Sequence, residues 1–241
     1  MSDVSVVNFV GALVMGSATV VFLRAAASDP DRRTDDLILA GITGFAFLAY
    51  VLMGLGYGRV AVGGGEANLV RYADWLLTTP LIVWYLARLA GVSRAAVARL
   101  VVLDVAMIGL GVVAVFTGGA VRWAAFSLSC VAFVGLAYVL TRGMADAAAD
   151  RPLPVVTLFG KLRTLTVLLW TLYPVVWVLS PLGFGVLLAG DAASTYLYMD
   201  VVAKAVFGYV ALQSGRALDA MGEADGSLDG ERVAPEPLAA D

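Results

Sequence analysis

Seven long apolar blocks, separated by short polar breaks, follow one another along the 241-residue chain. The blocks lack the alternation of polar and apolar positions that strands of a membrane barrel show. Each holds about 18–25 residues, the length of helix that crosses the roughly 30 Å hydrocarbon core of a bilayer. We therefore predict an all-α membrane protein with seven spanning helices. The predicted spans are residues 6–25, 37–56, 69–90, 96–116, 123–140, 155–179 and 194–214.

Turn-forming residues occupy the breaks between the blocks. Thr34 or Asp35 is a candidate cap for the second helix. Gly63, Gly64 and Gly65 allow a hairpin or a flexible turn before the third. Near the C-terminus the composition changes to Gly, Ala, Pro, Asp and Glu. We predict one transmembrane domain over residues 1–217 and a disordered, acidic tail over residues 218–241.

Composition excludes several classes of function. Hydrophobic residues make up 61% of the chain and charged residues 15%, whereas soluble domains average about 45–50% and 25%. The single cysteine, Cys130, rules out an internal disulfide framework and a cysteine-rich metal site. The lack of histidine excludes a Ser-His-Asp triad and histidine metal ligands. With no basic run for nucleic acid and no residue set for substrate turnover, we expect neither a nucleic-acid binder nor an enzyme.

The distribution of Lys and Arg predicts the orientation in the membrane. Ten of these residues fall in one set of breaks, whereas only Arg59 and Arg122 fall in the other. Because cytoplasmic loops carry the excess of positive charge, we predict an extracellular N-terminus and a cytoplasmic C-terminus.

Five ionisable residues interrupt the apolar blocks: Arg71, Asp74, Asp104, Asp200 and Lys204. Each costs roughly 2.5–3.5 kcal/mol at a helix centre, so each needs a partner or a function. Arg71 and Asp74 lie three residues apart, and Asp200 and Lys204 lie four apart, so each pair shares a helix face. If the two faces meet, two positive and two negative charges nearly cancel. Such a cluster is either a structural tie or a lysine that binds a carbonyl compound as a Schiff base beside carboxylate counterions.

Aromatic residues favour the second interpretation. Trp170, Tyr173, Pro174 and Trp177 fall at helical spacing on one face of the sixth block. This stripe is either ordinary packing or a flat-walled slot for a long conjugated ligand.

Three motifs make the chain resemble the archaeal microbial rhodopsins over nearly all of residues 1–217. They are RYADWLLTTP at residues 71–80, WTLYPVVW at residues 170–177 and DVVAK at residues 200–204. The resemblance implies a seven-helix rhodopsin bundle with all-trans retinal bound to Lys204 as a protonated Schiff base. It implies that Asp74 is the primary counterion and proton acceptor, and that Asp200 is the second counterion.

The resemblance also implies roles for neighbouring residues. Arg71 would balance the carboxylates, with Tyr50 and Tyr173 as hydrogen-bonding candidates. Asp104 would hydrogen-bond to Thr79, with a simple tie between helices as the alternative role. The implied lining of the retinal pocket is Trp75, Thr78, Thr79, Ile82, Met107, Phe126, Ser129, Cys130, Trp170, Tyr173, Pro174 and Trp177.

Sensors, proton pumps and chloride pumps all occur in this family. Asp74 argues against a chloride pump, which has a neutral residue at that position. The proton donor of the proton pumps is a carboxylate eleven residues after the counterion, where this chain has Tyr85. A phenol, with an ordinary pKa near 10, donates protons poorly. Leu182 and Ala192 stand where the pumps carry a pair of glutamates for proton release. We therefore expect a sensor, with a weak or slow outward proton pump as the alternative.

The wider likeness is to sensory rhodopsin II. It implies a phototaxis receptor in the cell membrane that binds a two-helix transducer through its sixth and seventh helices, and it leaves a homo-oligomer possible. Tyr198 matches a transducer-contacting position, but it is equally an ordinary interface anchor. Ala203 replaces the Thr or Ser that hydrogen-bonds to the sixth-helix tyrosine in that subfamily. Ser129 and Asp104 add polarity near the ring end of the pocket, so we expect absorption to the red of a typical sensory rhodopsin II.

Overall fold

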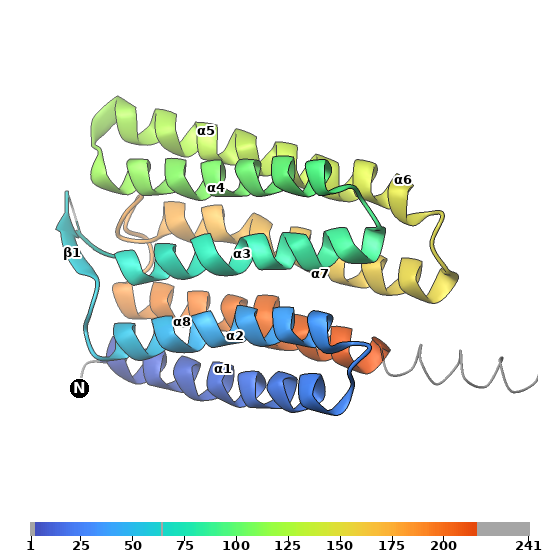
Figure 1. Cartoon of the computed structure of the whole chain (residues 1–241). Coiled ribbons are helices and arrows are strands. Elements are labelled where there is room, and N and C mark those ends of the chain that lie inside the picture. Colours follow the sequence, from blue (N-terminus) through green and yellow to red (C-terminus); the bar gives the residue numbers. More distant parts are fainter. Residues whose placement is uncertain (1–2, 64, 216–241) are drawn as a thin grey trace, which may run out of the picture.

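The computed structural model describes residues 3–63 and 65–215, which form a bundle of seven long helices (Figure 1). The first four are α1 (Asp3–Ser28), α2 (Arg33–Gly54), α3 (Leu69–Ala90) and α4 (Arg94–Phe116). The fifth runs through α5 (Gly119–Tyr138), the π-helical turn η1 (Val139–Gly143) and α6 (Met144–Ala148). The sixth is α7 (Leu153–Leu179). The seventh comprises α8 (Ala189–Asp200), the π-helical turn η2 (Val201–Val206) and a last segment that ends at Gly215.

The predicted all-α membrane architecture is confirmed. Six of the seven helices in the described chain are long and apolar enough to cross a membrane. The exception, α3, has 22 residues, but Arg71 and Asp74 interrupt its apolar run. A helix satisfies its own backbone hydrogen bonds, so it tolerates hydrocarbon on its outer face. The predicted tail over residues 218–241 lies outside the described residues.

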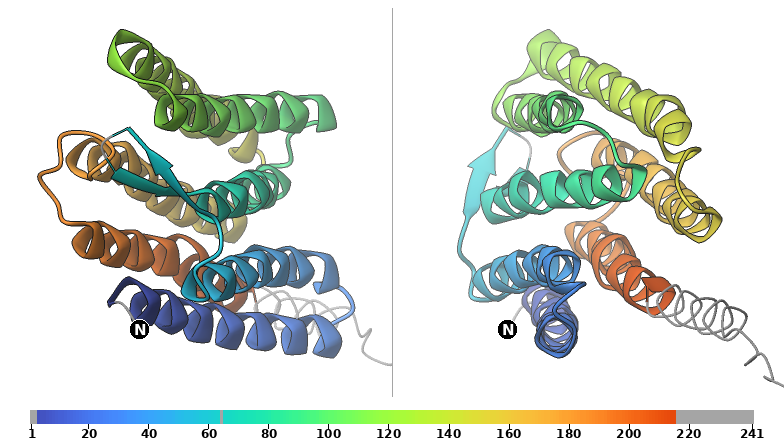
Figure 2. Two further views of the ribbon diagram at one scale, coloured as in Figure 1. Left: turned by 90° about the vertical axis from the view of Figure 1, so that its left-hand side faces the viewer. Right: turned by 45° about the vertical axis from the view of Figure 1, so that its right-hand side comes forward.

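The axes of the helices lie roughly parallel, and the chain alternates in direction from one helix to the next (Figures 1 and 2). α1 and α2 pack together at one side of the bundle, and α4 and α5 pack together at the other. α3, α7 and α8 lie between these two pairs, so their inward faces meet at the centre. Side chains on the inward faces of these three helices therefore form the centre of the bundle.

A two-stranded antiparallel hairpin lies at the same end of the bundle as the N-terminus (Figure 1). Its strands are β1 (Arg59–Val62) and β2 (Gly65–Asn68), with Val62 paired to Gly65. Of the two interpretations of the glycine run, the structure therefore has the hairpin. We call this end of the bundle the hairpin end.

Short polar side chains define several helix ends. The Asn68 side chain accepts a hydrogen bond from the Val70 amide at 3.0 Å and caps α3. Gly91 ends α3 at a φ of 72°, a conformation that favours glycine. The predicted cap of α2 is wrong, because this helix begins at Arg33 without a side-chain cap. Asp29 instead accepts hydrogen bonds from the two amides that precede the helix.

Arg122 joins three loops at the hairpin end. Its guanidinium donates hydrogen bonds to the carbonyls of Thr117 at 2.9 Å, Leu182 at 3.0 Å and Gly63 at 3.2 Å. These carbonyls belong to the α4–α5 loop, the α7–α8 loop and the hairpin turn. One charged side chain thus links three loops.

We expect Arg122→Met to lower the thermal unfolding midpoint, because three carbonyls lose a charged donor worth about 1.5–3 kcal/mol per bond at most. Thermal unfolding in detergent measures the effect. Arg99→Met is the matched control, because exposed Arg99 bonds only to a carbonyl of its own helix. Equal midpoints for the two variants would contradict the role of Arg122 as a joint between loops.

Candidate functional site

Four charged side chains meet in the interior: Arg71 and Asp74 from α3, Asp200 from α8 and Lys204 from η2. Lys204 Nζ contacts Asp74 Oδ2 and lies 3.6 Å from Asp200 Oδ1. Arg71 Nη1 lies 3.5 Å from Asp200 Oδ2. All four residues are at most 8% exposed. The two helix faces inferred from sequence spacing therefore meet, and their charges cancel.

Asp200 is the centre of this cluster and is fully buried. The hydroxyls of Tyr50 and Tyr173 each donate a hydrogen bond to it at 2.7 Å. The Trp75 indole nitrogen donates another at 3.4 Å. Hydrogen bonds to a carboxylate favour its charged form. Asp200 thus has neutral hydrogen-bond donors as well as charged neighbours around it.

Asp74 has far fewer partners. Its Oδ2 contacts Lys204, whereas its buried Oδ1 has no hydrogen-bond partner. The two carboxylates beside the lysine are therefore not equivalent, and Asp74 has the oxygen that is open to a new proton or water.

A π-helical turn aims the lysine at this cluster. η2 replaces the regular α-helical hydrogen bonds over Val201–Val206, and Lys204 lies within it. Single π turns inside α-helices occur frequently at functional sites, since they change the direction of one side chain. Spacing arguments based on a regular helix had no means of predicting this turn.

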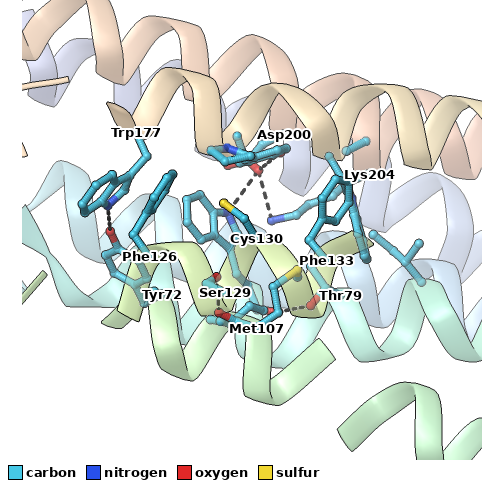
Figure 3. A pocket seen from close by; sticks show the side chains of 18 residues that line it. Tyr72, Thr79, Met107, Phe126, Ser129, Cys130, Phe133, Trp177, Asp200 and Lys204 are labelled. Atoms are coloured by element: carbon cyan, nitrogen blue, oxygen red, sulfur yellow. Dashed lines mark hydrogen bonds and ion pairs between the residues drawn. The ribbon is translucent and has the colours of Figure 1, made fainter. Parts of the chain in front are cut away.

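A cavity of about 110 Å³ extends from Lys204 between α3, α4, α5 and α7 (Figure 3). Its walls are largely aromatic: Phe126 and Trp177 stack with ring centroids 4.7 Å apart, and Trp75 meets Tyr173 edge-on at 5.2 Å. Residues from the predicted set that line it are Trp75, Thr79, Ile82, Met107, Phe126, Ser129, Cys130, Trp170, Tyr173, Pro174, Trp177 and Lys204.

The cavity and the predicted lining differ at several positions. Thr78 is buried but does not line the cavity, because its hydroxyl donates to the Asp74 carbonyl within α3. Helical spacing could have identified some lining residues that the sequence analysis missed, because Phe133 lies seven residues after Phe126 and Gly111 lies four after Met107. The missed residues are Tyr72, Ile108, Gly111 and Phe133, and the cavity is also lined by Asp200, predicted as the second counterion, and by Ala203.

Two polar contacts lie along the cavity, made by Thr79 and Ser129, which are both labelled in Figure 3. The Thr79 hydroxyl bonds to Asp104 Oδ2 at 2.7 Å, which links α3 to α4. The Ser129 hydroxyl donates to the Met107 carbonyl at 2.6 Å, which links α5 to α4. Asp104 is fully buried, and its other oxygen has no partner.

Positions singled out outside the cavity lie at three different places. Tyr85 is buried beyond the lysine, away from the hairpin end, and meets Phe207 edge-on at 5.7 Å. Leu182 and Ala192 line a second cavity of about 430 Å³ near the hairpin. Tyr198 is 72% exposed and points away from the bundle. Ala203, in contrast, lines the cavity beside the lysine and has no hydroxyl for Tyr173, whose own hydroxyl donates to Asp200.

Comparison with known proteins agrees with this arrangement. Residues 3–218 match the family described as bacteriorhodopsin-like proteins. The chain is 39% identical to sensory rhodopsin-2 of Haloarcula vallismortis, over 87% of this chain and 89% of the relative. It is 36% identical to sensory rhodopsin-2 of Natronomonas pharaonis, over 91% and 92%. It is 37% identical to bacteriorhodopsin of Halobacterium salinarum, over 96% and 87%.

A solved structure has the same architecture. The crystal structure of thermophilic rhodopsin from Rubrobacter xylanophilus superposes with a TM-score of 0.86 at 32% identity. The match covers 91% of this chain and 99% of that one.

We expect Thr79→Val to lower stability by about 1–3 kcal/mol, because buried Asp104 loses the hydroxyl that donates to it. Thermal or denaturant unfolding of the purified protein gives the difference. Thr171→Val serves as the control, since exposed Thr171 bonds only to a carbonyl of its own helix. If the two variants unfold alike, the Thr79–Asp104 contact contributes nothing beyond a lost hydroxyl.

Proposed function

This chain belongs to the family of bacteriorhodopsin-like proteins, and we propose that it is a light-sensing photoreceptor of the sensory rhodopsin type. The observation that carries the proposal is a buried lysine between two unequal carboxylates at the end of an aromatic cavity. On the side of the lysine away from the hairpin, a tyrosine stands where a pump carries a carboxylate.

Rhodopsins of this family bind retinal, and the residues of the cavity fit it. The long apolar slot has aromatic walls, Lys204 lies at one end, and carboxylates lie beside the lysine nitrogen. We propose that Lys204 holds all-trans retinal as a protonated Schiff base, with the cavity residues as its walls. When bound, retinal supplies the absorption of light and an isomerisation from all-trans to 13-cis.

In this proposal the proton on the Lys204 nitrogen passes to Asp74. Asp74 contacts the nitrogen and has an oxygen without a partner, whereas Asp200 already accepts two phenolic hydrogen bonds. Asp200 therefore stays ionised, with Arg71 beside it. The transfer removes the charge pair that joins α3 to η2.

Loss of that charge pair is the signal in our proposal. The pair draws α3 toward the seventh helix, so its neutralisation changes the relative stability of two helix packings. We propose that a two-helix membrane transducer reads this change at α7 and α8. Tyr198 is a candidate contact, because its ring is exposed on the outer face of α8.

The excess of Lys and Arg at the opposite end supports an extracellular hairpin end and a cytoplasmic C-terminus. We propose that the protein crosses the cell membrane in this orientation. Lipid then surrounds the exposed apolar helix faces. The proposal also allows for a homo-oligomer.

A slow outward proton pump is the second candidate, favoured by the likeness to a bacteriorhodopsin. Against it stand Tyr85 at the donor position and two apolar residues, Leu182 and Ala192, at the release positions. Without a carboxyl group at the position of Tyr85, we propose that protons reach Lys204 slowly from solvent, past buried Tyr85 and Phe207. The deprotonated state should therefore persist, which suits a receptor.

We expect Lys204→Ala to abolish the visible absorption band that forms when all-trans retinal is added to the expressed protein. Lys161→Ala is a matched control, because Lys161 is exposed and is the only other lysine in the sequence. Absorption spectra of the two variants decide the matter. A normal band in Lys204→Ala would mean that retinal binds elsewhere.

We expect Tyr85→Asp to speed the return of the proton to Lys204 by at least tenfold, since a carboxyl group is a better donor than a phenol. Flash photolysis at neutral pH measures the decay of the deprotonated state. In the unmodified protein we expect decay over hundreds of milliseconds or longer. Decay within a few milliseconds in the unmodified protein would favour a pump with another proton route. Unchanged kinetics in the variant would contradict the role given to Tyr85.

A further inference from the structure

The guanidinium of Arg71 is held only loosely by charge. Its ion pair with Asp200 spans 3.5 Å, longer than the roughly 2.7–2.9 Å of a strong charge-assisted hydrogen bond. Arg71 also lines the second cavity near the hairpin, whose volume is about 430 Å³. The side chain therefore has space on its outer side, and something other than Asp200 must hold it inward.

Two tyrosine rings flank this guanidinium. The Arg71 Cζ atom lies 5.0 Å from the ring centroid of Tyr196 and 5.7 Å from that of Tyr50. Both distances are within the range of a cation–π interaction, which strengthens when the partners are buried. Tyr50 is already engaged, because its hydroxyl donates to Asp200. Tyr196 is the nearer ring.

Tyr196 is itself fixed in place by other rings. It meets Trp75 edge-on at 5.6 Å and stacks on Tyr173 at 6.1 Å. It is 8% exposed and lines the same cavity as Arg71. Within the described residues no hydrogen bond of its hydroxyl is present, so its ring rather than its oxygen makes the contacts.

We propose that Tyr196 is a positioning residue, whose ring face holds Arg71 against Asp200 and away from the second cavity. The proposal rests on the proposed function, in which Asp74 is the counterion of Lys204. The charged groups that act on Asp74 are then Lys204 from η2, which contacts it, Asp200 from α8 and Arg71 from its own helix. A positive charge that stays close favours the ionised form of Asp74.

The test follows the acid-induced colour change of the retinal-loaded protein, which reports protonation of Asp74. In Tyr196→Leu we expect its midpoint to rise by about one pH unit, a tenfold change in proton affinity that corresponds to about 1.4 kcal/mol. Tyr196→Phe keeps the ring and should keep the parent midpoint. Tyr209→Leu controls for loss of a tyrosine on the same helix, because Tyr209 is exposed.

A double-mutant cycle separates positioning from a structural defect. In an Arg71→Gln background the cation is absent, so Tyr196→Leu should no longer move the midpoint. A shift of the same size in both backgrounds would overturn the proposal. An unchanged midpoint in the single variant Tyr196→Leu would also overturn the proposal. Neither result would contradict the proposed function.

A second measurement does not depend on colour. In protein labelled with ¹⁵N-arginine, NMR should show the Arg71 side-chain protons shifted upfield by the ring current, in the unmodified protein and in Tyr196→Phe. If Tyr196→Leu fails to fold, this signal alone decides: its absence from the unmodified protein overturns the proposal. Failure of the unmodified protein to acquire colour would instead count against the proposed function.

Discussion

The need to neutralise buried charge controls the centre of this protein. Lys204 lies in a region where an unpaired ion is costly, and it is tolerated because Asp74 and Asp200 lie beside it. Arg71 offsets the second carboxylate. The four side chains come from α3 and the seventh helix, so the same interaction that balances charge also sets how these helices approach each other.

The two carboxylates differ in their hydrogen-bond partners, and this difference makes Asp74 rather than Asp200 the proposed proton acceptor. Asp200 is surrounded by donors from α2, α3 and α7, whereas Asp74 contacts the lysine and keeps one oxygen without a partner. A proton that leaves the Lys204 nitrogen therefore has one suitable destination. In the proposed function, this asymmetry in hydrogen bonding makes Asp74 the proton acceptor and keeps Asp200 ionised.

The two ends of the bundle have different chemistry. At the hairpin end, Arg122 holds three loops over a cavity that reaches Arg71. At the other end, Tyr85 and Phe207 close the route to the lysine with aromatic packing. One side of the centre has open space beside Arg71, whereas on the other side buried aromatic rings pack beyond the lysine. Such a protein suits a long-lived change of charge better than rapid proton transport.

Much of this architecture could be predicted from the sequence, because a bilayer demands long apolar helices and penalises every charge within them. The seven spans, the aromatic stripe of the sixth span, and the helix faces shared by Arg71 with Asp74 and by Asp200 with Lys204 all follow from regular helical spacing. Most cavity residues also follow from the resemblance of three motifs. The roles assigned to them stay predictions until the proposed experiments are done.

Tertiary structure alone decided the features that depend on contacts between distant segments or on departures from a regular helix. No spacing rule predicts the π turn at Lys204, since it forms from competing backbone hydrogen bonds. The ring of Tyr196 over Arg71 joins residues on two helices that are separated by more than half of the chain. The sequence by itself determined which charges enter the membrane, because burial cost depends on residue type. Only the packed bundle determined which partner each charge has, because that depends on geometry.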